Sequence, residues 1–258
     1  MSSGTVSTQW LEIRPNARTL KTGEVIEEAP VTIYVNGITL ATIMSSPLDQ
    51  DLLALGFLKN EGLIESLAEI AILHISKMGC CVDIWLHRPF VKPSRTIITS
   101  GCGGGVTFTD PNEGIPPLDG TITLKPETIH QGFRQLQSSN SLYARSRGVH
   151  TAGLLDPQTG ELHAIVEDVG RHNTIDKIAG FCLKNNIQTQ QKALLVTGRI
   201  SSEMMRKAAL MGCPIVASLT SPTSLSIEMA RAWNITLVGY ARKKTMLIYT
   251  SPQRAGYK

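Results

Sequence analysis

Long apolar runs are missing from this chain of 258 residues. None approaches the ~20 consecutive apolar residues of a membrane-spanning helix, so we expect no segment that crosses a membrane. The first residues also lack the basic start, the apolar stretch and the small-residue cleavage site of a signal peptide. We therefore expect a cytoplasmic protein.

Cysteine is scarce, and its 5 copies lack the spacing of a disulfide framework. They are Cys80, Cys81, Cys102, Cys182 and Cys213. An odd number of scattered thiols is typical of a reducing compartment, where they serve for packing or chemistry. Cys80 and Cys81 are adjacent, which suits neither a four-ligand metal site nor an easy disulfide. Cys182 on an apolar helix face and Cys213 at a strand start are expected to be packing residues.

A strong excess of one charge is also absent, because 25 Lys and Arg residues face 21 Asp and Glu residues. The net charge of +4 permits an anionic ligand such as a phosphate ester. Nucleic-acid binding would require clustered Lys and Arg, so we expect no nucleic-acid partner. The most basic run, Arg242 to Lys244, is either a solvated hairpin tip or a ligand contact.

Ligand spacings for a metal are missing as well. His150, His172, Cys102 and Cys213 could meet only through the fold, since no Cys-x-x-Cys or His-x-x-x-His spacing exists. The His-x-Glu and Pro-Cys-x-x-Cys signature of zinc deaminases and the Gly-x-Ser-x-Gly elbow of hydrolases are absent too. We therefore expect no tightly bound metal. A hydrolase on this scaffold would need one.

The most unusual stretch that is present runs from Arg95 to Gly105. Within it, Cys102 stands among four glycines at positions 101, 103, 104 and 105. Glycine loses the most backbone entropy on ordering and packs no side chain, so this segment cannot hold a regular element. Cysteines kept for packing normally have apolar neighbours, unlike this one. The pattern predicts a loop with a reactive thiol at Cys102.

The first hundred residues predict a small α+β portion rich in hairpins. We expect residues 1–8 to be frayed and a strand to begin between Trp10 and Arg18. Alternating runs over 31–35 and 38–43 flank Asn36-Gly37, the strongest short signal for a hairpin. The other predicted elements are a helix from Ser46 to about Gly62, with Ser46 as N-cap and Pro47 at its first position, and strands over 70–75 and 82–86.

The second half has a different pattern, after a turn-rich connector over 110–120. Short apolar strands alternate there with amphipathic helices, which is typical of an α/β fold with a largely parallel sheet covered by helices. Hairpins at each end make the sheet mixed. The predicted helices begin at 126, near 173, at 201 and at 222, and the predicted strands cover 149–155, 162–166, 193–196, 215–219, 235–240 and 246–249.

Two predicted strand ends carry polar residues that could bind an anion. In open α/β sheets, ligands gather at the carboxyl ends of strands, where helix N-termini offer free amides. The candidate residues for a phosphate or ribose site are Thr197, Arg199, Ser201, Thr220 and Ser221. Each of them alone is equally an ordinary helix cap.

The segment from Glu167 to Asp176 is denser in functional side chains than any other. Asp168, Arg171 and His172 could bind an anion, shuttle a proton or lower the pKa of a nearby thiol. The alternative is a capping network, in which Asp168 or Asn173 caps the helix and the charges face water. The bunching of residue types favours a site.

Five segments, in this order along the chain, resemble the FdhD family of sulfurtransferases that make formate dehydrogenase active. They are Thr99–Gly103, Gly148–Gly153, Glu167–Lys177, Val196–Glu203 and Ser218–Ser224. The resemblance extends from about Val31 to Tyr249. It implies a homodimer with a cytidine-deaminase-like three-layer α/β/α core over 121–258, without the deaminase zinc ligands. A smaller portion over 9–110, ending in the Cys102 loop, would precede this core.

The resemblance also implies a reaction. A cysteine desulfurase would hand sulfur to Cys102, which carries it as a persulfide to the molybdenum of the bis(molybdopterin guanine dinucleotide) cofactor before insertion into formate dehydrogenase. Arg171 and His172 would either favour the thiolate or bind the cofactor. A cofactor-binding segment that takes the guanine nucleotide falls on Tyr240, Ala241, Arg242, Lys243, Lys244 and Thr245, where the basic groups would contact pyrophosphate.

One departure from the family concerns Gly105. Many members have a Cys-x-x-Cys pair here, whereas this chain has Cys102 followed by three glycines. A local disulfide therefore cannot release sulfide from Cys102. Either one thiol suffices, or the protein only escorts the cofactor and Cys102 is dispensable.

Overall fold

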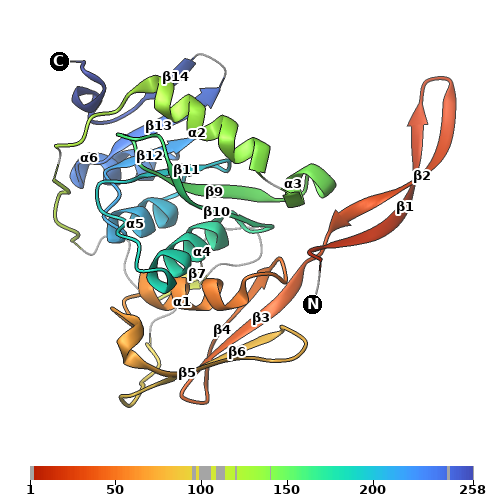
Figure 1. Ribbon diagram of the computed structural model, residues 1–258, viewed down its shortest axis with the longest axis horizontal. Helices are drawn as coiled ribbons and strands as arrows, with labels where there is room; N and C mark the ends of the chain where they lie inside the picture. The colour runs from red at the N-terminus through yellow and green to blue at the C-terminus, as the bar shows by residue number, and fades with distance from the viewer. Residues whose placement is uncertain are drawn as a thin grey trace.

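A computed structural model of the chain describes residues 3–94, 97–98, 106–108, 114–119, 121–139, 141–242 and 245–257. These residues form an α/β body from which one long hairpin projects (Figure 1). No helix in the described part of the chain is long and apolar enough to cross a bilayer.

The projecting hairpin, here called the arm, consists of β1 (Thr5–Arg14) and β2 (Ala17–Ile26), paired antiparallel over their full lengths (Figure 1). The prediction that residues 1–8 are frayed is therefore wrong, because pairing with β2 orders the strand from Thr5 onward. Gly23 makes room for Trp10: a Cβ atom on this glycine would lie 2.4 Å from the indole ring.

The N-terminal portion of the body contains a sheet with the strand order β4-β3-β6-β5. Its strands are β3 (Ala29–Val35), β4 (Ile38–Ser45), β5 (Ile70–Ile75) and β6 (Cys81–Leu86), with a short 3-10 helix at Leu67–Glu69. The Asn36-Gly37 hairpin is confirmed, and both turn residues have positive φ. Helix α1 (Gln50–Asn60) buries Leu53 and Phe57 against this sheet.

Helix α1 begins later than predicted. Its N-cap is Asp49, not Ser46, and the first helical residue is Gln50, not Pro47. Ser46 is engaged elsewhere: its hydroxyl accepts the N–H of Val169 at 3.0 Å and its own N–H donates to Asp168 at 3.2 Å. These contacts to the second half of the chain replace a cap.

A strand pair encloses the glycine-rich segment. β7 (Ile97–Ile98) pairs antiparallel with β8 (Val106–Thr107). The segment between them, with Cys102 and Gly105, lies outside the described residues. Its C-terminal end is anchored, because the Thr107 hydroxyl and the Phe108 N–H both donate to one carboxylate oxygen of buried Glu61, at 2.9 and 2.8 Å.

The second half forms the larger sheet, with the order β10-β9-β11-β12-β13-β14. Strands β11, β12 and β13 are parallel and the outer pairs are antiparallel, so the predicted mixed sheet is confirmed. The strands are β9 (His150–Leu155), β10 (Leu162–Asp168), β11 (Ala193–Val196), β12 (Ile215–Ser218), β13 (Thr236–Arg242) and β14 (Thr245–Ile248). The helices are α2 (Pro126–Ser139), α3 (Ser141–Ser146), α4 (Arg171–Lys184), α5 (Ser202–Leu210) and α6 (Ser224–Ala232), with a 3-10 helix at Pro252–Ala255.

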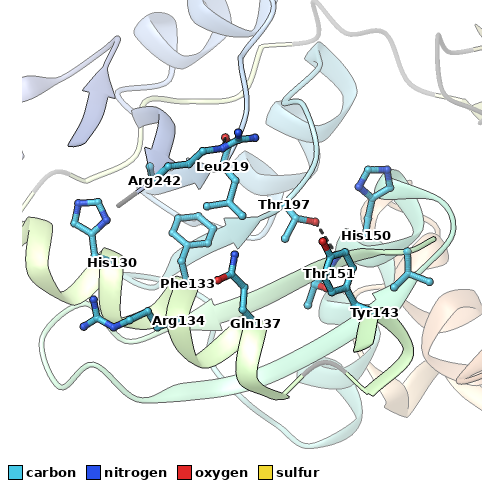
Figure 2. Close-up of a pocket in the computed structure, with 12 residues that line it drawn as sticks. His130, Phe133, Arg134, Gln137, Tyr143, His150, Thr151, Thr197, Leu219 and Arg242 are labelled. Atoms are coloured by element: carbon cyan, nitrogen blue, oxygen red, sulfur yellow. Dashed lines mark hydrogen bonds between the residues drawn. The ribbon is translucent and has the colours of Figure 1, made fainter. Parts of the chain in front are cut away.

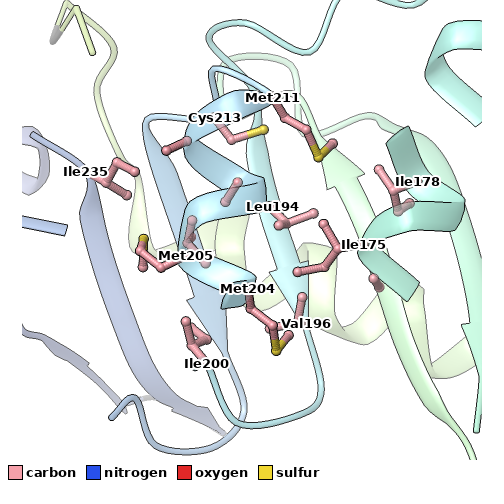
Figure 3. Packing of buried hydrophobic residues seen from close by; sticks show 14 of the residues in the cluster. Ile175, Ile178, Leu194, Val196, Ile200, Met204, Met205, Met211, Cys213 and Ile235 are labelled. Carbon is pink, nitrogen blue, oxygen red and sulfur yellow. The ribbon is translucent and has the colours of Figure 1, made fainter. Parts of the chain in front are cut away.

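Helices cover both faces of this sheet, which makes three layers. Helix α2 buries Ile129, Phe133 and Leu136 on one face, while α4, α5 and α6 pack on the other. Figure 3 shows part of the second cluster, in which Met204 of α5 packs near Val196 of β11. The α/β class is thus confirmed, and the cytidine-deaminase-like identity of the core stays a prediction.

Helices α1 and α4 join the two halves, lying side by side between the two sheets (Figure 1). Their backbones approach closely at two glycines. A Cβ atom on Gly56 would lie 1.7 Å from the carbonyl oxygen of Asp176, and one on Gly180 would lie 2.0 Å from that of Leu52. Only glycine permits this contact.

Candidate functional site

A pocket of about 910 Å³ opens at the carboxyl edge of the parallel strands (Figure 2). Thr197 follows β11, Leu219 follows β12, and Arg242 ends β13. The volume lies within the ~300–1,000 Å³ typical of small-molecule sites. The site therefore occupies the place where open α/β sheets usually bind ligands.

Helix α2 forms one wall of this pocket. His130, Arg134 and Gln137 follow one another at helical spacing and line the pocket together with Phe133. Figure 2 shows His130 and Phe133 opposite Arg242 and Leu219 across the cavity. The opposite end is closed by Tyr143, Val149, His150 and Thr151.

The lining is basic. None of the twelve described residues that line the pocket is acidic, whereas Arg134 and Arg242 each bring a positive charge. Burial, and then the charge of Arg171, lower the pKa of His150, which is therefore neutral near pH 7 and able to accept a hydrogen bond. Such a pocket suits an anionic ligand with a planar, partly apolar portion.

The two predicted strand-end loops lie side by side, as expected. Ile200 forms a parallel bridge with Pro222, and the Ser218 hydroxyl donates to the carbonyl of Gly198 at 2.7 Å. Thr197 accepts the N–H of Thr151 at 2.9 Å, which fixes its hydroxyl at the pocket wall (Figure 2). The Nε–H of Arg242 donates to the carbonyl of Leu219 at 2.6 Å.

The structure brings together only some of the predicted binding residues. Thr197, Ala241 and Arg242 line the pocket. The other described candidates are not among its lining residues: Arg171, His172, Arg199, Thr220, Ser221, Tyr240 and Thr245. Cys102, Lys243 and Lys244 lie outside the described residues.

The charged segment that follows β10 is buried, so the alternative in which its charges face water is wrong. Asp168 and Lys177 are fully buried and form an ion pair of 2.7 Å. Asp168 also accepts the hydroxyl of Ser45 at 2.7 Å and the side-chain N–H of Asn173 at 2.8 Å. Helix α4 is capped by Gly170 without a side-chain bond. These polar groups hold the two halves of the chain together.

His172 is the centre of a hydrogen-bonded relay. Its Nδ1 lies 3.0 Å from a carboxylate oxygen of Glu203, and its Nε2 lies 3.1 Å from the hydroxyl of Ser201. Burial lowers the pKa of His172 to about 4, although Glu203 opposes this shift. The neutral imidazole is hydrogen-bonded through Nε2 to the Ser201 hydroxyl, while its Nδ1 lies beside the Glu203 carboxylate. Ser201, predicted as a ligand or a cap, is the N-cap of α5.

The relay continues into a second buried ion pair. Lys207 lies 3.4 Å from Glu203 and 2.7 Å from Asp176. Burial raises the pKa of Asp176 to about 6 against the opposing charge of Lys207. Burial alone would lower the pKa of Lys207, but Asp176, Glu203 and Glu61 raise it above its ordinary value. Since Glu61 also anchors β8, the buried charges extend from α4 to the base of the Cys102 segment.

Within the described residues, no group of three or more His, Cys, Asp or Glu side chains is arranged to hold a metal ion. Cys182 and Cys213 are buried, as predicted, and burial raises the pKa of Cys182 to about 12. A metal-dependent hydrolase finds no support in this part of the chain.

Sequence reasoning missed the α2 wall. His130, Arg134 and Gln137 lie at positions i, i+4 and i+7, so they share one side of a helix whose apolar residues face the sheet. This spacing was visible in the sequence. The sequence did not show that this side of α2, with His130, Arg134 and Gln137, lies over the carboxyl edge of the strands.

Comparison with known proteins identifies the family of this chain. Residues 26–256 match the FdhD/NarQ family. The chain is 38% identical over 250 residues to the sulfur carrier protein FdhD of Bacillus pumilus, covering 94% of each chain. It is 35% identical to the sulfur carrier protein FdhD of Staphylococcus aureus strain MRSA252, covering 90% of this chain and 89% of the relative.

A solved structure is similar over nearly the whole chain. It is that of a putative formate dehydrogenase accessory protein from Desulfotalea psychrophila, with a TM-score of 0.84 and 28% sequence identity. The alignment covers 98% of this chain and 99% of the other. The arrangement of the sheets and helices, together with the family match over most of the sequence, leads to one conclusion: this chain belongs to the FdhD/NarQ family.

Proposed function

We propose that the protein is a sulfur carrier in the maturation of formate dehydrogenase, with Cys102 as the sulfur-bearing residue. Relatives at 38% and 35% identity carry the name sulfur carrier protein, and the similar solved structure is described as a formate dehydrogenase accessory protein. The observation that carries the proposal furthest is the basic pocket at the carboxyl edge of the sheet. It offers a place for the anionic cofactor that receives the sulfur.

The first chemical step conserves atoms and electrons. The Cys102 thiolate attacks the terminal sulfur of a desulfurase persulfide, the sulfur–sulfur bond of the donor breaks, and the donor leaves as its thiolate. Cys102 then bears a persulfide, and no external oxidant is needed. In the second step the sulfur–sulfur bond of the persulfide breaks, Cys102 leaves as its thiolate, and the outer sulfur bonds to the molybdenum. The cofactor, which is a substrate of this protein rather than a resident group, would supply the two electrons that reduce this sulfur to sulfide.

The pocket would take the guanine nucleotide part of that cofactor. Arg242 and Arg134 are the described cations placed to contact pyrophosphate, and Phe133 supplies an aromatic surface. Thr197 offers a fixed hydroxyl at the wall. Lys243 and Lys244 follow Arg242 directly, so the proposed cofactor segment Tyr240–Thr245 includes one pocket wall.

Chain length limits where Cys102 can act. It is four residues away from each of the paired residues Ile98 and Val106. A fully extended chain spans at most ~3.6 Å per residue, so the Cα of Cys102 stays within roughly 14 Å of that strand pair. The anchor at Glu61 therefore sets the region in which sulfur is received and delivered.

We also propose that the protein is a homodimer. The arm supports this, because a two-stranded hairpin is at best marginally stable alone. Leu11, Ile13 and Leu20 near its tip are 54%, 68% and 66% exposed. Contact with a second copy would bury them.

One experiment separates a carrier from an escort that merely binds the cofactor. Cells that lack their own accessory protein are supplied with the wild type, Cys102→Ser or Cys182→Ser, and formate dehydrogenase activity is measured. A carrier predicts a loss of at least ~100-fold for Cys102→Ser only. Full activity of Cys102→Ser would favour the escort. This alternative stays open because position 105 is a glycine and not a second cysteine.

A binding experiment tests the pocket independently. GDP affinity is measured for the wild type, Arg242→Ala and Arg134→Ala, with Arg231→Ala of α6 as a control outside the pocket. Loss of one charge-assisted contact predicts at least ~10-fold weaker binding for each pocket variant and none for the control. Unchanged affinity in both pocket variants would place the nucleotide elsewhere.

A further inference from the structure

Two thiols outside the glycine-rich segment lie side by side on the surface. Cys80 ends the turn between β5 and β6, Cys81 begins β6, and their sulfur atoms are 3.7 Å apart. Cys80 is exposed and Cys81 is partly covered. The turn is closed by Ser76, whose N–H donates to the carbonyl of Cys81 at 3.0 Å.

Ser76 also holds both cysteines. Its hydroxyl lies 3.6 Å from the sulfur of Cys80 and accepts the backbone N–H of Cys81 at 3.2 Å. A Cys80 thiolate can thus accept hydrogen bonds from the Ser76 hydroxyl and from the Cys81 thiol. Both contacts favour the charged form over the neutral thiol.

The electrostatics distinguish the two sulfurs. The hydrogen bonds from Ser76 and then from Cys81 lower the pKa of Cys80. Burial, and then the hydrogen bond to Cys80, raise the pKa of Cys81. The exposed Cys80 thiol therefore loses its proton more readily than the neighbouring Cys81 thiol. Cys182 and Cys213 are buried with raised pKa values, so Cys80 is the most reactive thiol of the described residues.

We propose that Cys80 is a second site of sulfane sulfur uptake, with Cys81 and Ser76 as positioning residues that stabilise its thiolate. This inference rests on the proposed function, since it assumes that persulfide donors meet this protein. The Cys80 thiolate attacks the terminal sulfur of a donor persulfide, one sulfur–sulfur bond forms as another breaks, and the donor departs as a thiolate. No oxidant is required, and no disulfide between Cys80 and Cys81 is formed.

Cys80 would give the protein a second reactive thiol, whereas the glycine-rich segment contains only Cys102. With glycine at position 105, Cys102 has no neighbour in the loop to accept its sulfur. Cys80 follows Gly79, where an added Cβ atom would lie 2.8 Å from the side chain of Gln50 at the start of α1. The base of the Cys102 segment is held near Glu61, at the other end of that helix. Cys80 would therefore accept sulfur at the opposite end of α1 from the Glu61 anchor.

Peptide mapping tests this proposal on the full-length chain carrying Cys102→Ala. The protein is incubated with glutathione persulfide, alkylated and digested, and the peptide that contains Cys80 and Cys81 is examined for one added sulfur atom. We expect this mass on the parent and on Cys81→Ser, and at least ~5-fold less of it on Cys80→Ser. Equal labelling of the two variants, or none in the parent, would overturn the proposal.

A second comparison tests the positioning residues. Ser76→Ala should slow alkylation of Cys80 at neutral pH by at least ~3-fold, because the thiolate loses a donor, whereas Ser224→Ala on α6 should not. An unchanged rate in Ser76→Ala would contradict the positioning role. A persulfide on Cys102 in an otherwise wild-type Cys80→Ser chain would show that the proposed function holds even if this inference fails.

Discussion

The charged side chains of the segment from Glu167 to Lys177 lie inside the protein, where they bind one another instead of water. Asp168 with Lys177 and Asp176 with Lys207 form buried ion pairs, and His172 joins Ser201 to Glu203. A buried pair stabilises little by itself, but removing one partner leaves an uncompensated charge. These residues therefore act as a rigid connection between the two halves of the chain.

The relay at His172 predicts a pH dependence of stability. Its pKa is about 4 in the folded protein and about 6.5 when exposed. The unfolded chain thus binds the proton more readily between these values, so this contribution is present above pH 6.5 and is lost as the pH falls to 4. The upper limit is about 3 kcal/mol.

The measurement compares urea unfolding at several pH values for the wild type, His172→Gln and His74→Gln, an exposed histidine on β5. His172→Gln should be less stable at pH 7 but should lose less stability between pH 6.5 and 4 than the other two. Parallel curves for all three proteins would show that His172 is not a neutral buried group.

Part of this site was predictable from single residues and part was not. The density of functional side chains between Glu167 and Asp176 singled out the segment that forms the buried ion pairs, while its role as a functional site stays a prediction; the apolar neighbours of Cys182 predicted its burial. The alternative with charges that face water was wrong because Asp168 also binds Ser45 and Ser46, which come from a distant part of the chain. The sequence around Asp168 cannot predict contacts with residues that far along the chain.

Helices α1 and α4 form the element on which the whole arrangement depends. Their crossing brings Asn60 of α1 within 2.7 Å of Asp176, which also binds Lys207. The glycines at the crossing are not turn residues, since both lie inside helices. Their role is to let two backbones touch.

Adding a methyl group at this crossing should therefore lower the free energy of unfolding. Gly56→Ala would place Cβ 1.7 Å from a carbonyl oxygen, so the helices must separate. We expect a loss of about 3 kcal/mol or more in the free energy of unfolding. Gly114→Ala, where nothing lies within 4 Å, should change it by less than about 0.5 kcal/mol. Equal stability of the two variants would rule out tight packing at this crossing.

Elements with strong local signals were predicted well, and those decided by tertiary contact were not. Asn36-Gly37 fixes the β3–β4 hairpin by its own backbone preference. Ser46-Pro47 has the chemistry of a helix start, yet Ser46 binds Val169 and α1 begins at Gln50. The arm was missed in part because β1 and β2 bury little, so they lack a clear apolar alternation.

At the scale of the whole molecule, a basic pocket and the strand pair β7–β8 belong to one body, from which the arm projects (Figure 1). The α/β class and the mixed sheet followed from the alternation of strands and helices in the second half. The position of the pocket could be predicted only in part from the sequence. Thr197 and Arg242 were expected to bind a ligand, but α2, which forms the other wall, is far from them in sequence. Covalent order alone does not show which face a helix covers.

The arm makes a prediction about assembly. Replacing Leu11, Ile13 and Leu20 together by serine should convert the dimer into a monomer, because the apolar contact with the second copy is lost. Light scattering after size-exclusion chromatography measures the mass, with Val91→Ser, exposed at 86% outside the arm, as the control. An unchanged dimer mass in the triple variant, or a monomeric wild type, would contradict this role of the arm.

The most direct test of the account is whether Cys102 receives sulfur. The purified protein is incubated with a cysteine desulfurase and cysteine, and the peptide that contains Cys102 is examined by mass spectrometry. The account predicts one added sulfur atom on Cys102 in the wild type, and in Cys102→Ala no added sulfur on the corresponding peptide. A wild-type Cys102 peptide without added sulfur, or an equal gain in Cys102→Ala, would contradict the carrier role.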